Sequence, residues 1–584
     1  MKRFSSYIQP TKRGHTINRP FIAVDTETRN EFGVVDAGRH TLLFGVAIYN
    51  SGAVSSNPYI FYEAYDFWEY VDNRADGELI VYAHNWNFDG AILDIGILGD
   101  MGYSMTGYVN DGNPPVIITY QKGRDKILLV DTLNYFRMSL KGLGRATGLD
   151  KLQMPETDDS DIWTEYAIRD TRIVEKAVME LREFVSDLGH NKLPNTIASL
   201  AFSIWRDLYN DGQIYVHNNS SALALERDSY KGGRCDAFYK GETKETLYQY
   251  DINSMYPTIM RDFKVPVSID GYYSKYRDSA FTGARRDGLQ IFANCVVSTE
   301  KECYPYRYNG KLIFPVGRFE TCLAWPELEY ALDCGDIDEI YGFSTYTSEY
   351  AFSDYVETIY NKRMEYTNKG NEGFAFFCKI LLNSLYGKFG QRSTEWVDYD
   401  GLPPDSDGYV ADEYGNLTRV RIRGGRAEIK VDRGESYYSC PSVAAAITSY
   451  GRLMLWKYID QVRYLGGTVY YCDTDSLVVD IKGKEYLDQF VGVELGMLKL
   501  ESVSDGGTFY APKDYVLNGR AKIKGIRNPV AGVREYKQDR FTSLNSHLSR
   551  GERGFVDIHK ITKRVSGDNL KRAPSEGLTE PIRL

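Results

Sequence analysis

Two aspartates separated by a single residue, Asp473 and Asp475, stand between two apolar segments at 470–472 and 477–479. The pattern predicts a β-hairpin with both carboxylates at its tip. Carboxylates beside buried strands are costly unless a cation balances them, and hard oxygen ligands of this kind suit Mg²⁺. Two such ions can hold the attacking and leaving oxygens of a phosphoryl transfer. Taken alone, the segment is equally consistent with an Asp-rich turn between ordinary strands.

Three more segments with acidic residues follow apolar elements in the N-terminal part of the chain. A buried-strand pattern covers 21–24, a short apolar run covers 79–82, and apolar residues at helical spacing cover 162–185. Side chains alternate along a strand and recur every three to four residues on a helix, so the polar residues of a segment can share one face. Taken separately, each segment is explained equally well by acidic residues on the surface or by an Asn/Asp turn as by a functional site. The residues concerned are Asp25 and Glu27, then Asn85, Phe88 and Asp89, then Tyr166 and Asp170.

Two further segments place polar residues beside an apolar element. Residues 247–250 read as a strand, and residues 377–388 read as a helix that ends near Gly387 or Gly390. On the helix, polar residues recur at i, i+4 and i+7, so one face can meet a triphosphate while leucines face the core. An ordinary amphipathic helix also explains this periodicity. The residues concerned are Asp251, Ser254, Met255 and Tyr256 after the strand, and Lys379, Asn383 and Tyr386 on the helix.

The composition is that of a folded protein with several domains. The chain has 584 residues, 43% of them hydrophobic, which suggests about three to four domains. The net charge is −10, but residues 511–572 carry 15 Lys/Arg against 6 Asp/Glu. This basic segment could grip phosphates while the acidic remainder holds cations, although a solvated basic face is the alternative.

The sequence also argues against several classes of protein. The eight cysteines are scattered and form no CxxC pair, which argues against a zinc site and a disulfide framework. No apolar run reaches the roughly 18 residues needed to span a bilayer. Residues 1–20 are polar and lack the apolar core of a signal peptide. We therefore expect a cytoplasmic protein, in the host cell cytoplasm if it is viral, without a membrane partner.

The N-terminal segments, taken in order, resemble the three exonuclease motifs of proofreading DNA polymerases of family B. The resemblance implies that four carboxylates hold two metal ions and that a tyrosine orients the attacking water. It also implies residues that contact a single-stranded 3' end and a lysine that assists the cleavage. The metal ligands are then Asp25, Glu27, Asp89 and Asp170, the orienting residue is Tyr166, the single-strand contacts are Thr28, Asn85, Phe88, Thr132 and Leu133, and the lysine is Lys151.

The later segments resemble the polymerase motifs of the same family. The resemblance implies that Asp251 joins Asp473 and Asp475 in a metal site, with Asp251 and Asp475 the more direct ligands. It assigns the incoming nucleotide to Ser254, Met255, Tyr256, Lys379, Asn383 and Tyr386, with Lys362 and Arg363 as lesser candidates at the start of the preceding helix. The ring of Tyr256 would leave little room for a 2'-hydroxyl. Template and primer contacts are assigned to Tyr230, Gly232, Gly233, Lys513 and Tyr515, with Lys522 and Lys524 just beyond.

Two features point to the protein-primed branch found in bacteriophages and linear plasmids. The chain is compact, and a Gly/Asp-rich segment separates Asn383 from Asp473 and reads as an inserted β-hairpin with strands around 418–422 and 427–431. Five basic residues between 419 and 430 give this hairpin a character suited to phosphates. The expected fold is α/β and α+β multidomain, an RNase H-like 3'-5' exonuclease followed by a right-hand polymerase with two terminal-protein-region insertions. The expected boundaries are 1–190 exonuclease, 191–260 palm, 261–352 first insertion, 353–392 fingers, 393–431 second insertion, 432–534 palm and 535–584 thumb.

The function that the resemblance implies is DNA-directed DNA synthesis with 3'-5' proofreading. Mg²⁺ is the expected cofactor, and Mn²⁺ is the expected substitute for it. The expected partners are a DNA primer-template, dNTPs, a terminal protein that supplies the priming hydroxyl, and a single-stranded DNA-binding protein, with the polymerase itself a monomer. One alternative is a conventionally primed phage or repair polymerase of family B. Another is a replisome scaffold with decayed sites, although such a scaffold is expected to have lost carboxylates and all seven are present.

Overall fold

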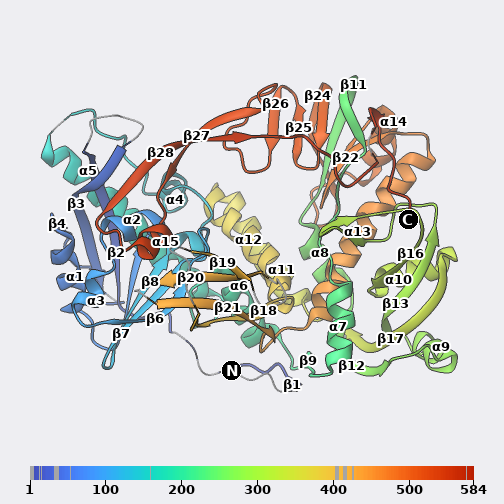
Figure 1. Ribbon diagram of the computed structural model, residues 1–584, viewed down its shortest axis with the longest axis horizontal. Helices are drawn as coiled ribbons and strands as arrows, with labels where there is room; N and C mark the ends of the chain where they lie inside the picture. The colour runs from blue at the N-terminus through green and yellow to red at the C-terminus, as the bar shows by residue number, and fades with distance from the viewer. Residues whose placement is uncertain are drawn as a thin grey trace.

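The computed structural model describes the chain except residues 1–4, 12, 13, 15, 32–37, 53, 158, 402–406, 412–416, 424, 425 and 574. Figure 1 shows two lobes, one around the N-terminal sheet and one that holds the middle of the chain. The C-terminal strands run across the top and connect the lobes. No helix in the described part of the chain is long and apolar enough to cross a bilayer.

The N-terminal lobe is built on a nine-stranded mixed sheet. Its central strand begins with four fully buried residues at 21–24, because neighbouring strands and helices cover both faces. The predicted helix over 162–185 is confirmed as α5 (Ser160–Asp187), which packs on this strand. The strand order is β27 (Glu535–Phe541), β28 (Phe555–Arg564), β3 (Gly38–Asn50), β2 (Phe21–Asn30), β5 (Glu78–Ala83), β8 (Asp125–Asp131), β7 (Ile117–Lys122) and β6 (Ser104–Val109), with β4 (Tyr59–Phe61) beside β3.

The second lobe is organised by an eight-stranded sheet that contains the predicted hairpin. The hairpin strands β22 and β23 pair with each other, and β23 pairs with the strand that ends beside Asp251. The predicted helix over 377–388 is confirmed as part of α12 (Glu372–Phe389), which packs between α6 (Ile197–Ile204), α11 (Ser353–Asn368) and α13 (Pro441–Tyr464). The sheet order is β10 (Cys235–Ala237), β22 (Val469–Asp473), β23 (Ser476–Val479), β11 (Tyr239–Ile252), β24 (Leu498–Ala511), β25 (Asp514–Leu517) and β26 (Arg520–Ile523), with β29 (Gly577–Leu578) on β11.

The two predicted insertions form separate small sheets. The first contains β12 (Val265–Tyr273), β17 (Ile337–Glu349), β13 (Gln290–Thr299) and β16 (Gly317–Leu323), together with α9 (Asp278–Arg286) and α10 (Trp325–Cys334). In the second, the expected hairpin is confirmed as the pair β20–β21, and two more strands flank it. The strand order of this second sheet is β18 (Arg392–Asp398), β21 (Arg426–Glu435), β20 (Leu417–Arg423) and β19 (Gly408–Ala411).

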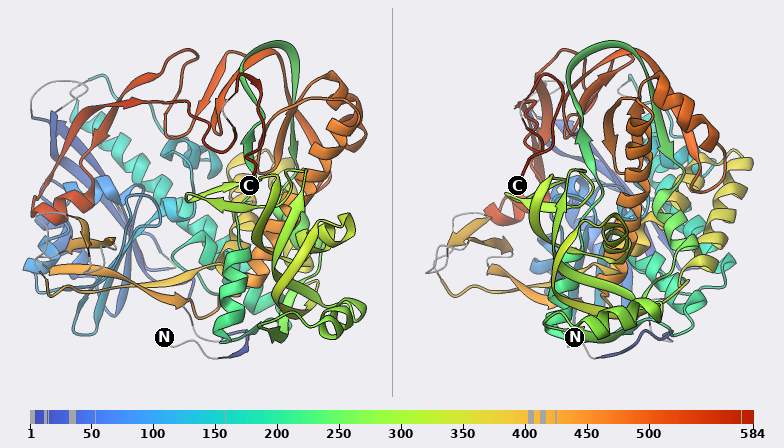
Figure 2. Two further views of the ribbon diagram at one scale, coloured as in Figure 1. Left: turned by 45° about the vertical axis from the view of Figure 1, so that its right-hand side comes forward. Right: turned by 90° about the vertical axis from the view of Figure 1, so that its right-hand side faces the viewer.

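The C-terminal segment does not stay in the second lobe. Strands β27 and β28 extend the N-terminal sheet through the pairing of β28 with β3, and Figure 2 shows these strands reaching across to the N-terminal lobe. Helix α15 (Leu544–Arg550) lies between them and packs on α2 (Trp86–Ile92). The last residues return to the second lobe, where β29 pairs with β11.

Candidate nucleotide and nucleic-acid sites

The N-terminal carboxylates converge from three elements. Asp25 and Glu27 lie two residues apart on β2, and Asp170 faces them from α5, so that one oxygen of each lies within 4.8 Å of the others. Asp89, from α2, is buried beside this cluster and accepts a hydrogen bond of 2.7 Å from Thr26 Oγ1. The four predicted residues are therefore brought together, three of them within ligand distance of one point.

Burial and mutual repulsion perturb these carboxyl groups. Burial, reinforced by repulsion from the Asp89, Glu27 and Asp170 carboxylates, raises the pKa of Asp25 well above its usual range. Burial also raises the pKa of Glu27 to about 7, with repulsion from Asp170 adding to it, and burial raises the pKa of Asp89 to about 7. Such crowding of acids is costly without cations.

One lysine enters this cluster. Lys151 donates a hydrogen bond through Nζ to Asp170 Oδ2, and the same nitrogen lies 4.4 Å from the centre of the Tyr166 ring. Within the described part of the chain, the other oxygen of Asp170, Oδ1, is buried and has no hydrogen-bond partner. A buried carboxylate oxygen without a donor, beside two further carboxylates, fits a divalent cation.

The predicted single-strand contacts differ in how they are placed. Asn85 has a left-handed φ of 100° at the start of α2, and its N–H donates to Asp131 Oδ1, which fixes the turn that presents Phe88. Thr28 Oγ1 lies 3.2 Å from His40 Nδ1. Thr132 is fully buried and its hydroxyl bonds His84 and a backbone carbonyl. Thr132 therefore supports the turn, and its buried hydroxyl is not accessible to single-stranded DNA. Its neighbour Leu133 is partly exposed.

The second acidic site is an open cleft of about 640 Å³ on the large sheet of the second lobe. The hairpin tip is tight, with Thr474 at a φ of 62° and the Asp475 N–H donating 2.7 Å to the Asp473 carbonyl. The N–H of Ile252 donates 2.7 Å to the Asp475 carbonyl, which locks the tip to the strand of Asp251. The cleft is lined by Gln249, Asp251, Lys379, Asp473, Thr474, Asp475, Ser476, Glu501, Lys513, Tyr515, Lys522, Ile523 and Lys524.

This cleft holds a fourth carboxylate that sequence reasoning missed. Glu501 lies on β24 at a register shift opposite Gln249 and Tyr250, and a bulge of this kind re-aims a side chain. Burial, together with repulsion from Asp475 and Glu501, raises the pKa of Asp251 to about 7. The strand irregularity that brings Glu501 to the cleft depends on the pairing of β11 with β24, which local sequence does not encode.

Of the predicted nucleotide residues, Lys379 lines this cleft. The rings of Tyr256 and Tyr386 are 4.7 Å apart. A Cβ on Gly233 would lie 3.0 Å from the Tyr256 hydroxyl, so a glycine is needed there. Asn383 Nδ2 donates 2.9 Å to the Lys379 carbonyl of its own helix. The side chain of Met255 is buried, so only its backbone is available to a nucleotide.

The expected position of two basic residues on the preceding helix was wrong. Lys362 and Arg363 lie in the second half of α11 and not at its start, because that helix begins at Ser353. Arg363 Nη1 donates 2.9 Å to Ser254 Oγ, whereas Lys362 lies 3.4 Å from Glu365. Arg363 is therefore tied to the segment that follows Asp251.

The predicted template and primer residues surround the hairpin. Lys513 Nζ lies 2.9 Å from both carboxylate oxygens of Asp473. The ring of Tyr515 packs on Tyr471, with centroids 4.7 Å apart, and Lys522 lies 5.9 Å from its centre. Lys524 lines the same cleft.

The segment around Tyr230 leads into β10, which pairs with the hairpin strand β22. Arg452 Nη1 donates 3.0 Å to the Gly232 carbonyl, and the Tyr230 ring packs against Gly390 at the end of α12. The Thr474 N–H donates 2.6 Å to the Arg234 carbonyl, next to Gly233. This segment therefore connects the hairpin tip to α12.

The basic residues of the second insertion were expected to face phosphates, and for two of them this was wrong. Arg421 and Arg423 are buried, and they bond Glu428 and Asp407 respectively. Arg419 pairs with Asp111 of the N-terminal lobe at 3.0 Å. The carboxylates of Glu428 and Asp407 satisfy the buried guanidinium groups from within the insertion. The bond from Arg421 Nη1 to the Tyr108 carbonyl and the Arg419–Asp111 pair fasten the insertion to the N-terminal lobe.

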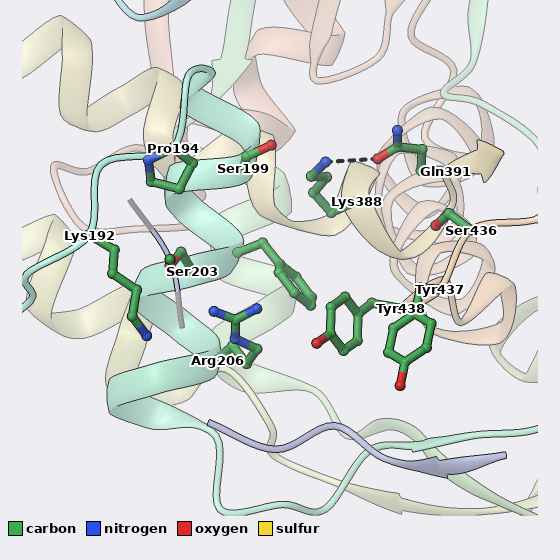
Figure 3. A pocket seen from close by; sticks show the side chains of 12 residues that line it. Lys192, Pro194, Ser199, Ser203, Arg206, Lys388, Gln391, Ser436, Tyr437 and Tyr438 are labelled. Carbon is green, nitrogen blue, oxygen red and sulfur yellow. Dashed lines mark hydrogen bonds between the residues drawn. The ribbon is translucent and has the colours of Figure 1, made fainter. Parts of the chain in front are cut away.

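A separate cavity of about 390 Å³ lies where this insertion leaves and re-enters the core (Figure 3). Phe202, Tyr437 and Tyr438 supply rings, and Lys388 Nζ donates 2.8 Å to Gln391 Oε1. Burial lowers the pKa of Lys388. The cavity is thus aromatic and basic, and none of the sequence-predicted site residues lines it.

The chain is similar to DNA polymerases in sequence and in fold. Residues 150–397 match the family described as DNA polymerase type B, organellar and viral. A probable DNA polymerase of Podospora anserina is 28% identical over 355 residues, which cover 55% of this chain and 28% of that protein. The DNA-directed DNA polymerase of Enterobacteria phage PRD1 is 29% identical over 301 residues, 50% of each chain. The match thus spans about a third to a half of the length of these curated relatives.

The fold resembles that of a solved polymerase over nearly the whole chain. The complex of phi29 DNA polymerase with primer-template DNA and incoming nucleotides has a TM-score of 0.68 and 17% identity, and the alignment covers 94% of this chain and 100% of that one. The predicted α/β and α+β multidomain fold is confirmed. Part of the chain thus resembles the organellar and viral DNA polymerases of type B in sequence, and nearly the whole chain resembles a solved DNA polymerase in fold.

Proposed function

We propose that the chain is a DNA-directed DNA polymerase with a 3'-5' exonuclease, which replicates a linear genome by protein-primed, strand-displacing synthesis. The observation that carries this proposal is the pair of separate carboxylate sites. Asp251 and Asp475 share one cleft with Lys379 and Lys513, while the N-terminal carboxylates form a cluster of their own. One chain thus has a place for synthesis and another for degradation.

In synthesis, a primer 3' hydroxyl attacks a deoxynucleoside triphosphate and pyrophosphate leaves. Divalent cations, when bound, supply the positive charge that this transfer requires, and Asp251 and Asp475 would hold them, with Asp473 beside them. Lys379 lines the cleft and offsets triphosphate charge. The packed rings of Tyr256 and Tyr386 form a wall that excludes a 2'-hydroxyl and supports the new base pair.

In degradation, water attacks the terminal phosphodiester of a single strand. The carboxylates Asp25, Glu27, Asp89 and Asp170 would hold the cations that activate this water. Tyr166, whose ring lies beside Lys151, orients the water, and Lys151 steadies Asp170. Phe88 offers a ring on which the terminal base stacks, a contact that tolerates any base.

The proposal also assigns protein priming and strand displacement to the two insertions. The first insertion would bind a terminal protein that supplies the first hydroxyl, and the second would separate the strands ahead of the cleft. The cavity at the root of the second insertion offers rings and Lys388 to a single-stranded template. We further propose Mg²⁺ as the physiological cation, replaceable by Mn²⁺, a single-stranded DNA-binding protein as a partner, and a monomer that acts in the host cytoplasm.

One set of assays tests the proposal. The purified protein is incubated with Mg²⁺ or Mn²⁺ and dNTPs on a primed circle, and separately with a candidate terminal protein on a linear template. Extension on the circle together with nucleotide linked to the terminal protein supports protein priming. Extension without linked nucleotide supports the conventionally primed alternative. The absence of both extension and degradation supports the scaffold alternative.

A further inference from the structure

The N-terminal site contains residues from the far end of the chain. Phe88 of α2 packs against Phe541, the last residue of β27, with ring centroids 5.9 Å apart and planes at 83°. Edge-to-face packing of this kind is favourable and directional, because the positive edge of one ring meets the negative face of the other. The orientation of the Phe88 ring is therefore set in part by a residue of the C-terminal hairpin.

A second contact fixes the distance between the hairpin and α2. Leu544, the first residue of α15, is buried in the same apolar cluster as Trp86 and packs at Gly90. A Cβ on Gly90 would lie 3.0 Å from Leu544 Cδ2. The glycine thus allows α15 to approach α2 more closely than a larger residue would permit.

A chain of hydrogen bonds makes a third connection. Asn545 Oδ1 accepts a 2.6 Å bond from the Tyr108 hydroxyl, and Asn545 Nδ2 donates 3.2 Å to the Asn110 carbonyl. Asn110 Nδ2 in turn donates 2.8 Å to Asn87 Oδ1 on α2. Both Asn87 and Asn110 are buried, so water competes little for these bonds.

We infer that Phe541 is a positioning residue for degradation of single strands. It holds the ring of Phe88 in the orientation in which that ring stacks on the 3'-terminal base. The inference rests on the proposed exonuclease function and adds that the C-terminal hairpin forms part of the exonuclease site. The hairpin belongs to the nine-stranded sheet of the N-terminal lobe and follows, after residues 524–534, the last strand of the eight-stranded sheet that carries Tyr515.

The test measures the degradation of a single-stranded oligonucleotide by Phe541→Ala and Phe541→Tyr. Loss of an orienting ring weakens ground-state binding, so Phe541→Ala is expected to raise KM about twofold to tenfold with kcat within about twofold. Phe541→Tyr keeps the ring and should restore the wild-type KM. Ile561→Ala, a large-to-small change on the same hairpin outside the apolar cluster of Phe88, is the matched control and should leave KM unchanged.

A double-mutant cycle separates positioning from general loosening of the hairpin. If Phe541 acts through Phe88, adding Phe541→Ala to Phe88→Ala changes KM no further. Binding is read independently in the Asp25→Ala background, from the fluorescence of 2-aminopurine at the 3' end. If the Phe541→Ala variant loses primer extension as well as degradation, the same measurements are made on Phe541→Leu. Leucine keeps an apolar side chain in this position without the aromatic ring.

The outcomes distinguish this inference from the function beneath it. A wild-type protein that degrades no single strand overturns the exonuclease proposal itself. A wild-type protein that degrades them, with an unchanged KM for Phe541→Ala or with additive effects in the cycle, overturns only the role of Phe541.

Discussion

The two carboxylate sites of this chain differ in how they balance charge. In the N-terminal site, one carboxylate oxygen of each of Asp25, Glu27 and Asp170 lies within 4.8 Å of the others, and Lys151 is bonded to Asp170. In the cleft of the second lobe, four carboxylates share a surface with four lysines, namely Asp251, Asp473, Asp475, Glu501, Lys379, Lys513, Lys522 and Lys524.

This difference matches the charge of what each site must receive. A crowded, largely buried acidic cluster needs cations before it can accept a phosphodiester. A cleft whose lysines already offset its carboxylates can accept the large negative charge of a triphosphate and a DNA backbone directly. The comparison predicts that each site can be destroyed without the other, and that the cleft responds in a graded way to single charges.

The largest effect is expected from Asp251→Asn, which removes one of the carboxylates of the cleft. Loss of a metal ligand costs several kcal/mol of charge stabilisation, so synthesis should fall about a thousandfold or more. Degradation of a 3'-labelled single strand, measured in the same preparation, should stay within about twofold. Loss of both activities in a folded protein would contradict the separation of the sites.

The reciprocal change is Asp25→Ala combined with Asp170→Ala. Excision of a mismatched 3' end should fall by a comparable factor, because the cluster loses two of its three converging oxygens. Primer extension on a gapped template should continue near the wild-type rate. Wild-type excision by this double variant would show that the cluster is not the exonuclease site.

A smaller effect is expected from Tyr256→Val. The ring packs against Tyr386, and its removal opens the volume that a 2'-hydroxyl needs. Incorporation of a ribonucleotide in competition with its deoxynucleotide should rise about tenfold, within the range by which a pocket rejects an added hydroxyl. Unchanged selectivity would mean that another side chain excludes the hydroxyl.

The graded response of the cleft is tested by Glu501→Gln. Removing one negative charge near Asp251 weakens the attraction for cations by about 1 kcal/mol, so the Mg²⁺ concentration for half-maximal synthesis should rise about fivefold. Asp505→Asn, on the same strand but outside the cleft, is the control and should behave as wild type. Equal behaviour of the two variants would remove Glu501 from the site.

The last prediction concerns stability rather than activity, at a buried histidine near the N-terminal site. Burial lowers the pKa of His84 to about 4, below its unfolded value of about 6.5. The stability that comes from keeping His84 neutral is therefore fully present above about pH 6.5 and is lost as the pH falls toward 4, by no more than about 3 kcal/mol. In chemical denaturation, His84→Gln should flatten this part of the stability profile, and a slope equal to that of wild type would assign it to other groups.

The sequence predicted which side chains share a face of one strand or one helix, because this depends only on short-range periodicity. Alternation along a strand put Asp25 and Glu27 on one face, helical spacing put Tyr166 and Asp170 on one face, and the Asp473 hairpin has its predicted form. These features depend on residues a few positions apart, and backbone geometry fixes their relation wherever the element packs.

The tertiary structure decided which distant groups meet. It paired Lys513 with Asp473 and brought Glu501 to Asp251 through a strand irregularity. It also turned Arg421 and Arg423 of the insertion inward and carried β28, within the segment expected to be the thumb, to the edge of β3. No local period encodes such contacts, because the pairing of strands far apart in the chain depends on the packing of the whole molecule.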